Sequence, residues 1–160
     1  MSENMTQKTN IKIRRAHGNE ASALTELSMR SKQSNGYDDA FMAACREELT
    51  VTAERLEEGE YWVAEADRVC GCACLVADLG KRTGEVHAFF IEPKWHRKGI
   101  GKLLWKKLLE RANAMGLEQL HLDADPAAVP FYNSLGFKVT GETPSGSIPG
   151  RNLPYMTFSL

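Results

Sequence analysis

The chain has 160 residues, a length that suits one domain able to bury roughly 70% of its unfolded surface. Its composition, 42% hydrophobic and 26% charged, is that of an ordinary globular protein. The formal net charge of −1 argues against a general binder of nucleic acids or membrane surfaces, because such proteins are usually strongly basic.

The first ten residues, MSENMTQKTN, are polar and lack the apolar core of a signal peptide. We expect residues 1–10 to be a disordered polar tail and residues 11–160 to form a single domain. No apolar stretch approaches the roughly 20 residues needed to span a bilayer. These features lead us to expect a cytoplasmic protein without a membrane partner.

Hydrophobic periodicity and turn residues divide the chain into strands mixed with helices, which predicts an α/β (α+β) fold with a mixed sheet. Seven segments have the composition of strands: 11–15, 61–66, 69–78, 85–91, 117–124, 137–142 and 154–160. Helical spacing covers 20–31, 38–48, 50–58 and 99–115. Asp125 can cap a further short helix that has Pro126 at its first position. Gly71 is the expected place for a β-bulge.

Three cysteines, Cys70, Cys72 and Cys74, alternate along one expected strand. Their side chains should therefore share one face of the sheet and cannot readily bridge each other. Cys45 or His87 could complete a metal site with them, but structural zinc sites favour CxxC spacing on turns. Packing in the core is the favoured interpretation, and no metal is expected.

The most informative segment is Glu85–Lys102, EVHAFFIEPKWHRKGIGK. A strand-like apolar run ends at Pro93, and a turn with Gly99 and Gly101 leads into the amphipathic helical pattern. Backbone N–H groups of a first helical turn are unpaired, and the helix dipole favours negative charge there. Four basic side chains surround this turn: His96, Arg97, Lys98 and Lys102. The segment predicts a site for a phosphorylated ligand.

The two glycines alone do not identify that ligand. The chain has no GxxxxGK[ST] string of a Walker phosphate loop, and GIGKLL lacks the third glycine of a dinucleotide fingerprint. On the glycines alone, an ordinary tight connection between a strand and a helix remains open.

The wider context adds a resemblance. HRKGIG resembles the pyrophosphate-binding motif of the GNAT acetyltransferase superfamily, with His96 where that motif has Arg or Gln. FFIEP looks like the family's fourth strand, and KLLWKKLLERANAMG looks like its third helix. DADPAAVPFYNSLGFKVTGE resembles the second signature of the family. The match covers about Tyr61 to Leu160, with both signatures in order.

The resemblance implies a central, mostly antiparallel sheet of about seven strands flanked by about four helices. Acetyl-CoA would be the co-substrate and would lie in a V-shaped opening between the fourth and fifth strands. The residues that would bind it are Phe89, Phe90, Ile91, His96, Arg97, Lys98, Gly99, Ile100, Gly101 and Lys102. A Cβ at the motif glycines would block the close approach of phosphate oxygens to the backbone.

Acetyl transfer to an amine needs a base. A lysine-like amine of pKa ~10.4 is neutral about once in 10³ at pH 7, a penalty near 4.6 kcal/mol, whereas a thiolate of pKa ~8.5 is mismatched by only about 2 kcal/mol. His87 and Glu85 are the candidates, since an imidazole suits a base at neutral pH and an arylalkylamine branch of the family has two histidines at these positions. Because Glu85 and His87 lie two residues apart on one strand, we expect them to share one face with Phe89 and Ile91.

Tyr132 matches the family tyrosine that donates a proton or hydrogen bond to the departing CoA sulfur. It could equally be a helix tyrosine that packs beside Phe131. The family builds its acceptor pocket from segments that correspond to about 33–44 and 143–155. Within them Tyr37, Asp38 and Arg151 are the candidate acceptor contacts, although each could be an ordinary surface or turn residue.

The sequence therefore predicts an acetyl-CoA-dependent N-acetyltransferase that moves the acetyl group directly to a primary amine. The alternative is a non-catalytic acyl-CoA-binding or regulatory module with the same fold. We expect no nucleic-acid partner. A homodimer is possible, because dimers are common among relatives. The sequence does not choose among small amines, polyamines, antibiotics, amino acids and protein termini as acceptors.

Overall fold

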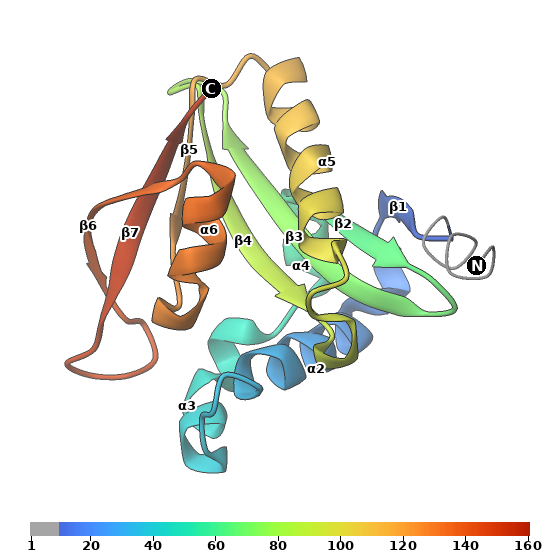
Figure 1. Ribbon diagram of the computed structural model, residues 1–160, viewed down its shortest axis with the longest axis vertical. Coiled ribbons are helices and arrows are strands. Elements are labelled where there is room, and N and C mark those ends of the chain that lie inside the picture. Colours follow the sequence, from blue (N-terminus) through green and yellow to red (C-terminus); the bar gives the residue numbers. More distant parts are fainter. Residues whose placement is uncertain (1–9) are drawn as a thin grey trace.

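The computed structural model describes residues 10–160, so the predicted tail falls outside the described residues except for Asn10. Seven strands form one sheet with the order β1-β2-β3-β4-β5-β7-β6 (Figure 1). They are β1 (Lys12–Arg15), β2 (Glu60–Glu65), β3 (Val69–Asp78), β4 (Thr83–Ile91), β5 (Gln119–Asp123), β6 (Lys138–Pro144) and β7 (Asn152–Ser159). Only the β4–β5 pair is parallel. The predicted mixed, mostly antiparallel sheet of seven strands is confirmed.

Five α-helices flank the sheet in residues 10–160, where about four were expected. They are α2 (Ala21–Gln33), α3 (Asp39–Leu49), α4 (Ala53–Glu58), α5 (Ile100–Ala114) and α6 (Val129–Leu135). Short 3₁₀ turns precede α2, α5 and α6: η1 (Gly18–Glu20), η2 (Pro93–Trp95) and η3 (Pro126–Ala128). Helices α3 and α4 stay separate because Thr50 is extended and the Thr52 side chain caps α4.

The helices cover the two faces of the sheet and make two cores. Helices α5 and α6 lie over one face (Figure 1), where Leu104 and Leu108 of α5 are completely buried. Leu24 and Leu27 of α2 pack on the opposite face. We call these the α5 face and the α2 face. The apolar stripe predicted for α5 thus fixes this helix on the sheet, and its N-terminus lies beyond the end of β4.

Of the three register shifts in the described part of the sheet, two, both β-bulges, change side-chain directions near the middle of the sheet. Ala64 pairs with Gly71 and Glu65 pairs with Val69, so the extra residue is Cys70 and not Gly71 as predicted. The prediction that three cysteines share one face is therefore wrong: Cys70 packs in the α5-face core, whereas Cys72 and Cys74 pack in the α2-face core. The expectation that all three pack in the core is confirmed.

The second bulge lies in β4. Cys74 pairs with His87 and Cys72 with Phe90, so β4 has one residue more than β3 between these pairs. Ala88 takes a left-handed backbone conformation there, with φ of 48°, which is uncommon for a residue with a Cβ. After the bulge, Phe89 and Ile91 pack in the α5-face core.

Strands β4 and β5 pair only at their beginnings, from Thr83–Glu85 to Gln119–His121. Figure 1 shows the two strands side by side near the C-terminus and diverging toward the lower part of the view. Beyond Glu85, the edge of β4 that faces β5 has no strand partner. Across residues 10–160, no helix combines the length and apolar character that a bilayer crossing requires.

Candidate active site

A cavity of about 1170 Å³ occupies the place where β4 and β5 separate. Phe131 and Tyr132 line it from the α5 face, and Glu85 and His87 line it from the α2 face. Helix α2, the end of α3, the N-terminus of α5 and the β6–β7 hairpin complete the walls. The cavity therefore reaches both faces of the sheet through the opening between the two strands.

The N-terminus of α5 opens into this cavity. Gly99 precedes the helix with φ of 82°, a left-handed conformation that glycine adopts without steric cost. The first helical hydrogen bond runs from the Leu103 amide to the Gly99 carbonyl over 3.2 Å. The amides of residues 100–102 therefore have no acceptor within the helix, as the sequence predicts for a helix N-terminus that could bind an anion.

Gly101 has a packing role in addition to the ligand access that the sequence predicts. A Cβ at this position would lie 2.9 Å from the ring of Phe131, closer than real Cβ contacts allow. The sequence argument had assigned this glycine only to the approach of phosphate oxygens. In the structure it also lets α5 and α6 meet beside the cavity.

The basic residues of the loop do not all face the cavity. His96, Arg97 and Lys102 line it, whereas the Lys98 ammonium lies 5.9 Å from the centre of the Trp95 ring. The His96 Nε2 atom is 3.0 Å from the carbonyl oxygen of Ile91. The imidazole thus ties the loop back to the end of β4, which explains how a histidine fits where the motif has Arg or Gln.

The edge of β4 beside the cavity includes Phe89 to Ile91, the segment expected to pair with the pantetheine arm. The Phe89 ring packs edge-to-face against Phe131, with centroids 5.5 Å apart, and against Tyr132, with centroids 6.0 Å apart. Phe89 and Ile91 point to the α5 face, and Phe90 points to the α2 face. The side chains fill the cores while the backbone edge is left for a ligand.

Glu85 and His87 lie on the α2 face, because their partners across the ladder, Val76 and Cys74, belong to that side. The prediction that they share a face with Phe89 and Ile91 is wrong, since the bulge at Ala88 reverses the alternation. The Glu85 Oε1 atom is 3.0 Å from His87 Nε2, and the two side chains are 35% and 45% exposed. This hydrogen bond holds the pKa of the Glu85 carboxyl below its usual range, against the opposing effect of burial.

A second histidine stands beside this pair. His121 of β5 is the direct partner of Glu85 in the last register pair before the strands separate. It contributes a favourable charge interaction that helps to lower the pKa of Glu85. His121 is not among the site residues predicted from the sequence, because the pairing of β4 with β5 is a long-range contact.

Tyr132 lies on the other side of the opening, in a cage of aromatic rings that includes Phe89, Phe131 and Phe137. The Tyr132 residue as a whole is only 8% exposed. Burial raises the pKa of its phenol well above the usual value, and the charge of Asp125 adds to this shift. The hydroxyl therefore keeps its proton at neutral pH.

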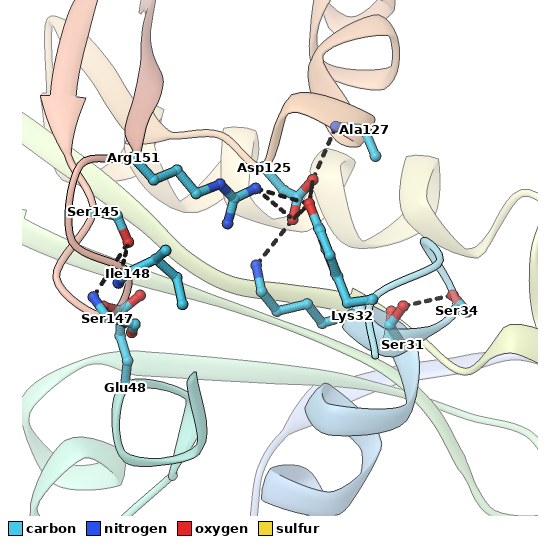
Figure 2. A network of polar contacts seen from close by, with 11 residues as sticks. Ser31, Lys32, Ser34, Glu48, Asp125, Ala127, Ser145, Ser147, Ile148 and Arg151 are labelled. Carbon is cyan, nitrogen blue, oxygen red and sulfur yellow. Dashed lines mark hydrogen bonds and ion pairs between the residues drawn. The ribbon is translucent and has the colours of Figure 1, made fainter. Parts of the chain in front are cut away.

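The three candidate acceptor contacts separate in the structure. Asp38 caps α3, where its carboxylate accepts the Phe41 amide at 2.8 Å. Tyr37 and Arg151 meet each other: an Arg151 Nη2 donates to the Tyr37 hydroxyl over 2.8 Å. They join a polar cluster around Asp125 that also contains Lys32, a residue that sequence reasoning missed (Figure 2).

Among residues 10–160, no group of three or more His, Cys, Asp or Glu side chains is arranged to hold a metal ion.

Comparison with known proteins agrees with this geometry. The profile of the acetyltransferase (GNAT) domain matches residues 26–146. The peptidyl-lysine N-acetyltransferase YjaB of Salmonella typhimurium is 33% identical over 152 residues, which cover 94% of this chain and 97% of that protein. Human N-acetyltransferase 8 is 31% identical over 112 residues, which cover 64% of this chain and 49% of that protein.

Solved structures share the fold. The PaiA N-acetyltransferase of Thermoplasma acidophilum, in complex with coenzyme A, superimposes with a TM-score of 0.75 at 21% identity and covers 94% of this chain and 99% of its own. YncA of Salmonella typhimurium, with its cofactor acetyl-CoA, gives a TM-score of 0.66 at 24% identity and covers 94% of each chain. The fold is thus the GNAT fold, and the chain belongs to the GNAT family of acetyl-CoA-dependent N-acetyltransferases.

Proposed function

We propose that this chain transfers an acetyl group directly from acetyl-CoA to a primary amine, with donor and acceptor entering from opposite faces of the sheet. The observation that carries the proposal is the cavity between β4 and β5, which joins Tyr132 on the α5 face to His87 on the α2 face. A thioester seated in the opening would meet an acid on one side and a base on the other.

The donor would lie on the α5 face. Its pyrophosphate would accept hydrogen bonds from the amides at the N-terminus of α5, with Arg97 and Lys102 supplying positive charge. The unpaired edge of β4 from Phe89 to Ile91 would hold the pantetheine arm. This arrangement brings the thioester beside Tyr132.

The acceptor would approach from the α2 face. His87 would take a proton from the incoming ammonium group, and the Glu85 carboxylate, 3.0 Å away, would orient the imidazole. The neutral amine then attacks the thioester carbonyl carbon and forms the new C–N bond. As the C–S bond breaks, the phenol of Tyr132 donates its proton to the departing sulfur. The second proton of the attacking nitrogen is then lost and restores the phenol, so that the products are the neutral amide and the CoA thiol.

Direct transfer is favoured over an acyl-cysteine intermediate because the cysteines beside the cavity are poor nucleophiles. Burial raises the pKa of Cys74 to about 12 and that of Cys72 to about 12. Attack requires the thiolate, which is rare at neutral pH when the pKa lies that high. Cys45, Cys70, Cys72 and Cys74 are all free thiols, which suits the reducing cytoplasm that we propose as the location.

The charge of the acceptor side supports a cationic acceptor. By acceptor side we mean the part of the cavity on the α2 face. Its lining includes five carboxylates and two basic side chains, and a third basic side chain, Arg151, lies 3.9 Å from Asp125 behind the lining. The lining residues are Glu48, Glu58, Glu85, Asp123, Asp125, Lys32 and Arg55. An excess of negative charge attracts ammonium groups and repels phosphates. A lysine side chain fits this preference, in line with the relative named as a peptidyl-lysine N-acetyltransferase.

The test is the release of CoA from acetyl-CoA in the presence of three acceptors. We expect turnover with a lysine-containing peptide and with spermidine. Glucosamine 6-phosphate, which carries a phosphate beside its amine, should give a kcat/KM lower by about tenfold or more. Faster turnover of the phosphorylated sugar than of both cationic amines would refute the proposed acceptor class.

A further inference from the structure

Asp125 is the centre of a polar cluster that joins distant parts of the chain (Figure 2). The Lys32 ammonium of α2 lies 2.9 Å from its Oδ2, and the Tyr37 hydroxyl lies 3.0 Å from each carboxylate oxygen. The Ala127 amide donates to Oδ1 over 2.9 Å. The capping role predicted for Asp125 is present, but it is one of several contacts.

Arg151 brings a third segment into the cluster. Its Nη2 donates to Tyr37 over 2.8 Å and lies 3.9 Å from the Asp125 carboxylate. The guanidinium also lies over the rings of Tyr37 and Phe41, at 5.3 and 5.0 Å from their centres. The two rings are stacked on each other at 4.1 Å. The loop between β6 and β7 is thereby bound to the segment between α2 and α3.

The same loop is attached at a second point, near the end of α3. The Ser147 hydroxyl donates to Glu48 Oε2 over 2.9 Å, and a Cβ at Gly146 would lie 2.7 Å from that oxygen. Figure 2 shows Ser147 and Glu48 as a separate group beside the Asp125 cluster. Both Glu48 and Gly146 line the cavity, so the loop forms part of the acceptor wall.

Asp125 is unsuited to bind the acceptor itself. Its side chain is only 14% exposed, and both oxygens already accept hydrogen bonds from three groups. Its place in the chain suggests another role, because it lies two residues after β5 and caps η3, which runs directly into the helix of Tyr132. The Asp125 carboxylate is attached to the turn before the helix of Tyr132, and through its partners to the α2–α3 segment and the β6–β7 loop. It can therefore fix the positions of these three segments relative to one another.

We propose that Asp125 is a positioning residue that fastens the β6–β7 loop and the α2–α3 segment to the turn carrying Tyr132, so that the acceptor side of the cavity is closed around the amine. Lys32, Tyr37 and Arg151 are the partners through which it acts. The effect of Asp125 on catalysis rests on the proposed function, whereas its attachment of the β6–β7 loop and the α2–α3 segment does not.

Hydrogen–deuterium exchange of the full chain tests the fastening without any substrate. In the β6–β7 loop, the amides of Ser145 and Arg151 donate to backbone carbonyls, so their protection reports on the loop. We expect Asp125→Asn and Arg151→Gln each to raise exchange across residues 145–151 about tenfold, while residues 104–112 of the buried helix α5 stay unchanged.

Glu26→Gln is the matched control, because it removes one carboxylate from an exposed ion pair with Arg46 on the same helices. It should leave exchange in residues 145–151 unchanged. If Asp125→Asn does not fold, Arg151→Gln decides alone. The proposal would be overturned if exchange in residues 145–151 stayed unaltered in the folded Asp125→Asn or Arg151→Gln variant. It would also be overturned if Glu26→Gln raised this exchange equally.

Kinetics with a lysine-containing peptide then test the positioning role. We expect Asp125→Asn and Arg151→Gln to lower kcat/KM for the peptide at least tenfold, while the Kd for acetyl-CoA changes less than twofold. If these variants exchange faster in the β6–β7 loop but keep the wild-type kcat/KM for the peptide, the positioning role of Asp125 is refuted. A wild-type chain that turns over no amine would refute the proposed function instead, and the exchange result would still decide the fastening.

Discussion

Replacing Tyr132 with phenylalanine separates the chemical role of this residue from its packing role. The ring lies against Phe89, Phe131 and Phe137, and the phenylalanine ring can keep these contacts. Burial and the charge of Asp125 act on the phenol, and within residues 10–160 no side-chain hydrogen bond to the hydroxyl would be lost. Its removal should therefore change the free energy of unfolding by no more than about 0.5 kcal/mol.

The effect on catalysis should be much larger. The thiol of CoA has a pKa of ~8.5, so releasing it as the thiolate at pH 7 costs about 2 kcal/mol relative to the thiol. A positioned proton donor typically raises the rate by about 10²–10⁴-fold. We expect Tyr132→Phe to lower kcat by about 10²-fold, measured by CoA release at saturating acetyl-CoA and peptide. The thermal stabilisation by acetyl-CoA, about 2.7 kcal/mol at 100 times Kd, should match that of the wild type.

Tyr155→Phe is the matched control, because it also removes a phenol hydroxyl but Tyr155 does not line the cavity. Tyr155 is half-buried and its ring lies 5.8 Å from that of His121, a contact that phenylalanine keeps, so kcat should stay within about twofold of the wild type. A Tyr132→Phe variant with unchanged kcat would refute the proton-donor role. Loss of acetyl-CoA binding in parallel with kcat would show that the tyrosine acts through packing alone.

Three further predictions concern other parts of the site. His87→Gln should abolish the acidic limb of the pH profile of kcat/KM, and an unchanged limb would remove His87 as the base. Gly101→Ala should destabilise the fold by about 1–3 kcal/mol in urea unfolding, because its Cβ would meet Phe131, and should weaken acetyl-CoA binding; a fully stable variant would show that α6 yields easily. Burial acts to raise the pKa of Asp125, but Lys32 and the Ala127 amide outweigh it and hold the pKa below its usual range. The stabilisation from this charge is therefore present above the ordinary pKa of about 3.9 and is lost as the pH falls through the lower folded value. Unfolding curves of wild type and Asp125→Asn should differ at pH 7 and converge in strong acid, whereas a constant difference would contradict the assignment.

The elements that the sequence predicted best are those with a strong local pattern. Helix α5 begins and ends within one residue of the predicted range, because its apolar stripe and Gly99 are visible in the sequence. Strand β4 was placed within two residues for the same reason. The loop between them was also correctly identified as a helix N-terminus with unpaired amides.

The side-chain directions were the part that local patterns could not supply. Alternation along β4 predicts that His87 and Phe89 share a face, yet Ala88 adds a residue relative to β3 and reverses them. No glycine or proline marks this bulge. The opposite placement of His87 and Phe89 is what makes a site with access from two faces, so the error concerned the functional geometry itself.

The polar cluster was hidden for a related reason. Asp125 carries a clear capping signal, which the structure confirms. Lys32 and Tyr37 are 93 and 88 residues away from Asp125 in the sequence, and Arg151 is 114 residues away from Tyr37. No local spacing therefore links the members of the cluster. Such contacts are set by the pairing order of the sheet, which brings the β6–β7 loop beside the first helices.

The most direct test of the account is the rate of CoA release from acetyl-CoA with and without a lysine-containing peptide, together with the mass of the peptide afterwards. We predict release that depends on the peptide and yields an acetylated lysine. Stabilisation of the protein by acetyl-CoA, with no release above the peptide-free rate for the peptide or for spermidine, would contradict transfer to a cationic amine and favour a chain that only binds acyl-CoA.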